Sequence, residues 1–175
     1  MPIHQRFRGF TLIELLIVIA IIGLTATITI AAVGGARAKA RDEKRVTDLK
    51  QIQKALELSF EPGSGYPVVA SPLTLGAGTT DVLCAKGAVA SFAADQGVGN
   101  CDLGRVYMGL VPANPTPNGA AYAYRSTNGI ISTCTTAPCL GYCVQSSLER
   151  GLPQIELAAG AVMVDQSSLR NGTCP

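Results

Sequence analysis

An uncharged run of bilayer length is the feature that most limits how this chain can fold. No charged residue lies between Leu15 and Ala36, a stretch of about 22 positions that would span about 33 Å as a helix. The hydrocarbon core of a bilayer is about 30 Å thick. We therefore predict a membrane segment near the N-terminus, followed by about 140 residues that suit one small domain.

The charge balance differs between the two parts of the chain. Residues 1–61 hold nine Lys and Arg against six acidic residues, whereas residues 62–175 hold five against six. The net charge of +2 therefore comes from the N-terminal part, and the globular part is nearly neutral. This distribution excludes the broad basic face that nucleic-acid binding requires.

Three interpretations compete for residues 1–40. A secretory signal peptide cut after the pattern Ala36-Arg37-Ala38 would have an apolar region of about 7 to 15 residues, which is shorter than this run. A plain uncleaved anchor leaves Glu14 inside the apolar segment, at a cost on the order of a few kcal/mol unless its carboxylate snorkels or is paired. Cleavage between Gly9 and Phe10 would instead expose an amine on Phe10 one helical turn from Glu14, and so supply a partner charge.

The residues around Glu14 resemble those of a known family. The segment RGFTLIELLIVIAIIGLTA, residues 8–26, is similar to the prepilin leader and N-terminal helix of type IV pilins and the related pseudopilins. The segment ARDEKRVTDLKQIQKALELSFEPGSGYP, residues 40–67, resembles the second half of a pilin stem helix and its exit into the head. The resemblance implies that a membrane peptidase removes residues 1–9 on the cytoplasmic side and N-methylates Phe10.

The same resemblance implies an α+β fold, in which a long N-terminal helix packs on a small antiparallel sheet that belongs to a disulfide-bearing head. The expected segments are a leader (1–9), a transmembrane and filament-core helix (10–36), an amphipathic stem helix (37–61) and an extracellular head (62–175). The Phe10 ammonium of one subunit would meet Glu14 of a neighbour in lipid, because a buried carboxylate stays charged cheaply only beside a cation. Glu14 would then set the register of assembly.

The function that follows is that of a structural subunit of a type IV pilus-like filament. Its expected partners are further copies of the chain, a prepilin peptidase and methyltransferase, and an inner-membrane assembly platform. A pseudopilin of a type II secretion system is the first alternative, and a monomeric signal-anchored extracellular binding module is the second. We expect a single-pass membrane protein with its head outside, then a filament on the cell surface. Charge counting opposes this orientation, because more basic residues follow the apolar run than precede it.

The stem is predicted to be one helix, because no proline lies between Phe10 and Glu61. Gly23 and the pair Gly34-Gly35 are weak points at which such a helix could stretch or bend. An apolar stripe within an arc of about 120° should bury the C-terminal half against the head. Its members are Val46, Leu49, Ile52, Leu56 and Phe60, whereas Glu43, Lys44, Asp48, Lys50, Lys54 and Glu57 lie elsewhere.

The remaining sequence is rich in Gly, Ala, Ser and Thr and predicts a head of short strands. We expect residues 68–105 to be loop with at most one short helix. Strands are predicted at Val106 to Val111, Ala120 to Arg125, Ile130 to Cys134, Tyr142 to Ser146 and Ala161 to Val164. Asn128-Gly129 favours a hairpin turn, and the two prolines in residues 114–119 exclude a central strand there.

All six cysteines follow the apolar run: Cys84, Cys101, Cys134, Cys139, Cys143 and Cys174. An even number in a small, turn-rich head predicts an oxidising compartment with up to three disulfides, for which fifteen connectivities exist. A zinc site is the main rival, but the spacing C-x4-C-x3-C lacks the usual paired knuckles and no histidine is near. Among the fifteen, we prefer Cys84 with Cys101, Cys134 with Cys139, and Cys143 with Cys174.

The sequence offers no constellation for catalysis. The only histidine, His4, lies in the leader that we expect to be removed, so the mature chain cannot form a Ser-His or Cys-His pair or a His-ligated metal site. The acids of the head are scattered along the chain: Asp81, Asp95, Asp102, Glu149, Glu156 and Asp165. A Ca²⁺ site, which some pseudopilins use to order their heads, has no support here. We expect a structural subunit without cofactor or metal, and not an enzyme.

Overall fold

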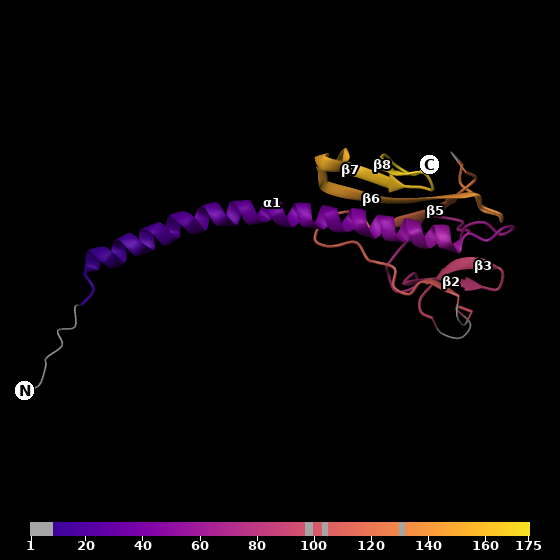
Figure 1. Cartoon of the computed structure of the whole chain (residues 1–175), viewed down its shortest axis with the longest axis horizontal. Coiled ribbons are helices and arrows are strands. Elements are labelled where there is room, and N and C mark those ends of the chain that lie inside the picture. The colour runs from indigo at the N-terminus through magenta and orange to yellow at the C-terminus, as the bar shows by residue number, and fades with distance from the viewer. Residues whose placement is uncertain (1–8, 97–99, 103–104, 130–131) are drawn as a thin grey trace, which may run out of the picture. The chain divides into compact units, whose positions relative to one another are not determined.

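The computed structural model describes residues 9–96, 100–102, 105–129 and 132–175. These described residues form one α-helix, one short 3-10 helix and eight strands, whose arrangement Figure 1 shows. In chain order these are α1 (Leu12–Ser59), β1 (Leu73–Thr74), β2 (Val82–Lys86), β3 (Val89–Ala93), β4 (Val106–Met108), β5 (Ala123–Thr127), β6 (Gly141–Leu152), η1 (Pro153–Ile155), β7 (Leu157–Val164) and β8 (Leu169–Asn171).

Helix α1 confirms the prediction of one long helix. It continues through Gly23 and the pair Gly34-Gly35, and it ends at Ser59, shortly before Pro62. The chain divides into two compact units, one ending at Arg37 and the other comprising Ala38–Pro175. Helix α1 contributes to both units, so its C-terminal half is part of the second.

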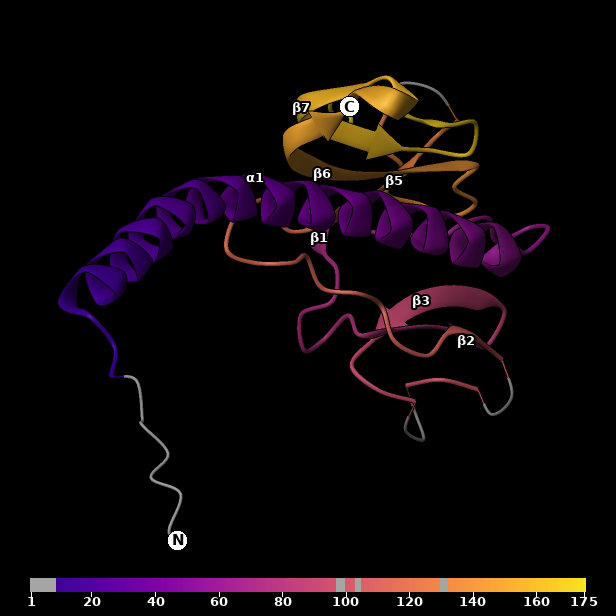
Figure 2. The same cartoon turned by 60° about the vertical axis from the view of Figure 1, so that its left-hand side comes forward.

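The unit Ala38–Pro175 contains two antiparallel sheets rather than the single sheet expected. Five strands pair in the order β1-β5-β6-β7-β8, and three pair in the order β3-β2-β4. Figures 1 and 2 show the five-stranded sheet along one side of the C-terminal half of α1 and the β2–β3 hairpin along the other. The class is α+β, with a long helix packed on small antiparallel sheets, as predicted.

The core of this unit lies where α1 meets the five-stranded sheet. Leu49, Ile52 and Leu56 are at most 1% exposed, and they pack in one cluster with apolar side chains of β5, β6 and β7. Tyr124 pairs with Val144 across β5 and β6, and Val144 pairs with Val164 across β6 and β7, so one inward row crosses three strands. The predicted stripe therefore buries the stem, except at its last member.

Phe60 is the exception, because α1 ends one residue before it. Its side chain is 40% exposed, and its ring lies 5.0 Å from that of Tyr66. Once the helix has ended, the 3.6-residue period no longer fixes the direction of the next side chain. Conversely, Asp48 lies outside the predicted stripe and is nevertheless only 5% exposed.

One prediction about the head was wrong, and the described part of another forms no strand. Residues 68–105 form β1, β2 and β3, and their described part contains no helix. The strand predicted at Ile130 to Cys134 falls partly on Ile130 and Ile131, which lie outside the described residues. The rest of it forms only an isolated bridge between Thr133 and Thr127. β5 does end beside Asn128-Gly129, but its neighbours in the sheet are β1 and β6.

Three disulfides join the six cysteines: Cys84–Cys101, Cys134–Cys139 and Cys143–Cys174. These pairs coincide with the connectivity preferred from the sequence. The bond Cys84–Cys101 lies in a separate small apolar cluster with Val82, Ala93 and Val106. The bond Cys143–Cys174 links β6 to the C-terminal segment, across 31 residues of sequence.

Removing Cys143–Cys174 should destabilise the head more than removing Cys134–Cys139. In the chain-entropy model the stabilisation grows with the closed loop, and the two bonds span 31 and 5 residues. We expect Cys143→Ala/Cys174→Ala to lower the free energy of unfolding by about 3 to 4 kcal/mol, and Cys134→Ala/Cys139→Ala by about 2 kcal/mol. Urea unfolding of the oxidised full chain in non-ionic detergent would measure both, and equal losses would contradict the loop-length argument.

Candidate functional site

The predicted processing point, Gly9-Phe10, is the first described part of the chain. Phe10 is 81% exposed, and a Cβ placed on Gly9 would meet no atom within 4 Å. Helix α1 begins two residues later, at Leu12. The bond between Gly9 and Phe10 therefore lies in an exposed, non-helical segment just before the helix, where a peptidase could reach it. The leader residues 1–8 lie outside the described residues.

Glu14 takes part in a capping box with Thr11. Its Oε2 atom accepts hydrogen bonds from the Thr11 backbone N–H at 2.9 Å and from the Thr11 hydroxyl at 2.7 Å. The Thr11 hydroxyl accepts in turn from the Glu14 N–H at 3.3 Å. This reciprocal pair satisfies two of the free N–H groups at the start of a helix.

This contact gives Glu14 a local role, as part of a helix cap, in addition to the assembly role predicted from the sequence. The signal was present, because Thr11-Leu12-Ile13-Glu14 fits the S/T-x-x-E pattern of a capping box. In this chain the carboxylate of Glu14 is bonded to Thr11 and not to Phe10. The structure therefore leaves the expected pairing of Glu14 with a neighbour's Phe10 as a prediction.

The first half of α1 presents apolar side chains to its surroundings. From Phe10 to Val33 the large apolar side chains are exposed, and Leu12 reaches 88%. By length and composition, α1 is the one helix in the described residues that could cross a membrane. A contiguous apolar surface of this length requires lipid or other apolar helices around it.

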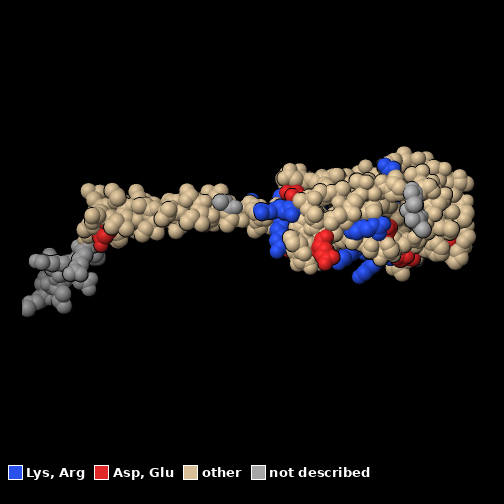
Figure 3. All heavy atoms as spheres, turned by 90° about the horizontal axis from the view of Figure 1, so that it is seen from above, with Lys and Arg blue, Asp and Glu red and all other residues tan. Residues whose placement is uncertain are grey.

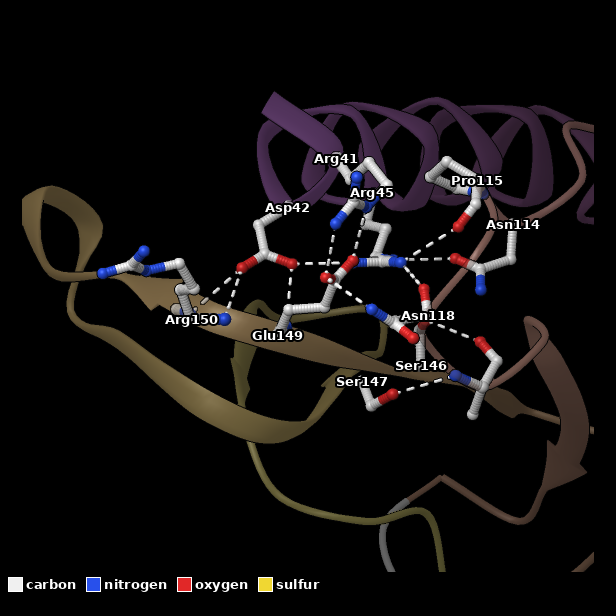
Figure 4. A network of polar contacts seen from close by, with 12 residues as sticks. Arg41, Asp42, Arg45, Asn114, Pro115, Asn118, Ser146, Ser147, Glu149 and Arg150 are labelled. Atoms are coloured by element: carbon white, nitrogen blue, oxygen red, sulfur yellow. Dashed lines mark hydrogen bonds and ion pairs between the residues drawn. The ribbon is translucent and has the colours of Figure 1, made fainter. Parts of the chain in front are cut away.

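The second half of α1 is tied to the head by a buried ionic cluster, which we call the polar clamp: Arg41, Asp42, Arg45 and Glu149 (Figure 4). Arg45 and Asp42 are both fully buried, and their side chains pair at 2.8 Å. Arg41 binds Glu149 through two hydrogen bonds of 2.7 Å each, the bidentate geometry that favours Arg over Lys. Two cations and two anions therefore balance within the clamp.

Arg45 also holds the proline-containing loop of residues 114–119 against the helix. Its Nε donates to Asn114 Oδ1 at 2.8 Å, and its NH2 group donates to the backbone oxygens of Pro115, at 3.0 Å, and Asn118. Gly119 has a φ of +114°, and a Cβ there would lie 2.6 Å from this NH2 group. The position must be glycine, because the backbone approaches the guanidinium so closely.

Asp42 satisfies the backbone of a β-bulge in β6. The register between β6 and β7 shifts between Leu148 and Gly151, which leaves N–H groups outside the regular ladder. Asp42 accepts from the N–H groups of Glu149, Arg150 and Gly151 at 2.9, 2.8 and 3.1 Å. A buried N–H without a partner is costly, so this carboxylate fixes the position of α1 on β6.

Two further carboxylates of α1 accept hydrogen bonds from tyrosines of the head. Tyr122 donates its hydroxyl to Asp48 at 2.9 Å. Tyr142 and Tyr66 donate to the two oxygens of Glu57 at 2.7 and 2.9 Å. Burial, reinforced by these acceptors, raises the pKa of Tyr122 and Tyr142, so both remain protonated donors at physiological pH.

The clamp makes the head sensitive to acid. The hydrogen bonds from Arg41, together with those from Arg45 and Asn118, hold the pKa of Glu149 at about 2 although burial opposes them. A carboxylate whose pKa is lower in the folded state contributes stability above its unfolded pKa, near 4.5, and loses it as pH falls towards the folded value. We expect the urea concentration at the unfolding midpoint to decrease as the pH is lowered from about 5 to about 2. The variant Glu149→Gln should show a smaller decrease over the same range. An unchanged slope in the variant would contradict the assignment to Glu149.

The acids that the sequence left scattered have local roles in the structure where their contacts are described. Asp165 caps a turn by accepting from Ser167 and Ser168, and it pairs with Arg170 at 2.5 Å. Burial alone would raise the pKa of Asp165, but the bonds from Ser167 and Arg170 lower it to about 2. Asp102 accepts from the Gly87 N–H at 2.8 Å. Among the described residues, no group of three or more His, Cys, Asp or Glu could hold a metal ion.

Comparison with known proteins places the N-terminal segment in a recognised class. Residues 4–30 match the model of the prokaryotic N-terminal methylation motif. The chain is also similar to curated proteins named type II secretion system core protein G. The identity is 40% over 63 residues for the protein of Klebsiella pneumoniae and 37% over 63 residues for that of Escherichia coli K12.

These matches are partial. They cover 36% of this chain in both cases, and 45% and 43% of the two relatives, so the chain matches less than half the length of these relatives. A third relative of the same name, from Vibrio cholerae, is 36% identical over 63 residues. No solved structure matches the chain significantly.

Proposed function

We propose that this chain, whose N-terminal segment carries the prokaryotic N-terminal methylation motif, is a structural subunit of a type IV pilin-like filament. A prepilin peptidase would cut between Gly9 and Phe10 and methylate the new amine. The processed subunit would stay in the membrane through the first half of α1. It would then enter a helical filament in which these apolar halves pack against one another.

The observation that carries this proposal is the combination found at residues 9–14. An uncovered Gly9-Phe10 bond immediately precedes the helix, and Glu14 is the only charged residue of the described chain before Arg37. The apolar side chains that follow are exposed along the first half of α1. A surface of this kind is stable in lipid and, after extraction, only against other apolar helices.

Among filaments, we favour the pseudopilus of a type II secretion system. The relatives carry the name of a secretion component, which supports this alternative over the surface pilus that the sequence reading preferred. The subunit would then be anchored in the inner membrane before assembly, with an assembly platform and further copies of the chain as its partners.

A surface pilus is the second candidate, and the three disulfides of the head favour it. Cross-links of this kind stabilise a small domain against unfolding outside the cell. A monomeric signal-anchored binding module is a third possibility, in which Gly9-Phe10 would remain uncut.

Two experiments on the producing organism together distinguish the three candidate functions. Mass spectrometry of the mature protein should find methylated Phe10 as the first residue, and a chain that starts at Met1 or Ala38 would contradict both filament proposals. Inactivating the gene should stop the release of type II secretion substrates and leave surface pili in place. Loss of surface fibres with normal secretion would support the pilus instead.

A further inference from the structure

The basic residues that follow the apolar run have no role in the proposed assembly. Five of them lie between Arg37 and Arg45, whereas the described chain before the run has none and the leader adds only Arg6 and Arg8. Basic residues normally stay on the cytoplasmic side of a membrane helix. With the head outside the cytoplasm, as the proposed function requires, these basic residues lie on the side of the membrane where the rule does not expect them. An interaction on that side should then offset the cost of placing them there.

The structure divides these five residues into two groups. Arg41 and Arg45 are neutralised inside the polar clamp by Asp42 and Glu149. Lys44 belongs to the same, paired group, because its Nζ atom lies 3.1 Å from a carboxylate oxygen of Asp48. Arg37 and Lys39 remain, and both are exposed. The nearest acid to Lys39 is Glu43, at 3.9 Å, and both side chains are more than half exposed, so this pair contributes little.

Within the described residues, the Arg37 side chain has no ion-pair partner. Arg37 and Lys39 lie two residues apart on the same helix, α1, so their proximity follows from the helix itself. We call these two residues the basic collar.

The basic collar begins where the apolar run ends. Arg37 directly follows Ala36, and Figure 3 shows a stretch of helix without blue or red atoms, at whose end blue side chains appear, with red ones among them. A run of about 33 Å matches the hydrocarbon thickness, so the side chains that follow it fall at the level of the lipid phosphates. Long basic side chains reach that level readily, because their stems tolerate apolar surroundings.

We propose that the basic collar binds the phosphate groups of anionic phospholipids in the leaflet where α1 leaves the membrane. Each Lys or Arg near an anionic membrane surface raises the affinity for that surface, relative to a neutral one, by about fivefold. The collar would hold the unassembled subunit at a fixed depth and make its extraction depend on lipid charge. The inference goes beyond the proposed function and does not require it, because it concerns a single copy in a bilayer.

Spin-label spectroscopy of the full chain in vesicles tests this binding. The probes are phosphatidylglycerol and phosphatidylcholine, each spin-labelled, and the readout is the ratio of the two lipids immobilised at the protein. We expect Arg37→Gln/Lys39→Gln to lower the preference for phosphatidylglycerol several-fold. The matched control is Lys50→Gln/Lys54→Gln, which removes the same charge from exposed positions farther along α1 and should leave the ratio unchanged.

Salt gives an independent check, because about 0.5 M NaCl should weaken the preference of the wild-type chain. Equal affinity of the wild-type chain for both lipids, or equal losses in the two double variants, would overturn the proposal. So would a variant Arg37→Gln/Lys39→Gln that keeps its lipid preference but fails to assemble, because the collar would then contact a neighbouring subunit. Failure of the wild-type chain to form filaments, with its lipid preference intact, would instead count against the proposed function and leave this proposal standing.

Discussion

Replacing Glu14 by alanine is expected to abolish filament assembly while the subunit still inserts into the membrane. In the proposed filament the Phe10 ammonium of an incoming subunit meets Glu14 of a neighbour in lipid. Without the carboxylate that ammonium is unpaired, at a cost of a few kcal/mol per contact. Because about 1.4 kcal/mol is a factor of ten, we expect the sheared-filament fraction to fall at least about 100-fold. Immunoblots of filament and membrane fractions measure both quantities.

The capping box provides the matched control for this experiment. Thr11→Val removes the hydroxyl that bonds Glu14 at 2.7 Å and leaves the carboxylate in place. Loss of a cap costs about 1 kcal/mol, so assembly should fall only about fivefold. Glu14→Gln keeps an acceptor for Thr11 but removes the charge, so it should be as defective as Glu14→Ala. If Glu14→Gln assembles normally, or if Thr11→Val fails equally, Glu14 acts as a helix cap and not as an assembly charge.

The sequence predicted those parts of the molecule in which one physical effect dominates. A long run without charge or proline permits only a helix in lipid, and α1 runs from Leu12 to Ser59. The apolar period of its second half identified the buried face at Leu49, Ile52 and Leu56. Both signals are local, so they need no knowledge of what packs against the helix.

The polar clamp was missed, although its positions continue the same pattern. Asp42, Arg45, Leu49, Ile52 and Leu56 are spaced by three and four residues in turn, which places all five on one face of a helix. The predicted stripe was defined by apolar residues and therefore did not include the first two, which are charged. Their burial depends on Glu149 and on the bulge of β6, both more than 100 residues away. Only the tertiary structure brings these partners together.

The strands of residues 68–105 were missed for a related reason. β2, with the sequence Val82-Leu83-Cys84-Ala85-Lys86, has four buried residues in succession and no alternation. A short apolar run of this kind cannot be distinguished from loop or helix by periodicity alone. β2 is a central strand, with β3 and β4 on its two sides, and its Cys84 forms the bond to Cys101. Its identity comes from pairing between segments, not from its own pattern.

Replacing Arg45 by methionine is expected to be the most destabilising single change in the head. Arg45 is fully buried and bonds Asp42, Glu149, Asn114 and the backbone of the 114–119 loop. Methionine fills much of the space but leaves Asp42 as a buried charge without its cation. Breaking a buried pair in this way costs about 3 to 5 kcal/mol. The chain has no Trp, so tyrosine fluorescence during urea unfolding of the full chain in detergent is the suitable measurement.

Arg41→Met is the matched control, because its side chain is 21% exposed and bonds only one member of the clamp, Glu149. Since Glu149 keeps its bond to Arg45, we expect a loss of about 1 kcal/mol. The double variant Asp42→Asn/Arg45→Met removes both buried charges and should be less destabilised than the sum of its single variants. Equal losses for Arg41→Met and Arg45→Met would show that the clamp is permeable to water. Its buried charges could then not be what fixes the stem on the head.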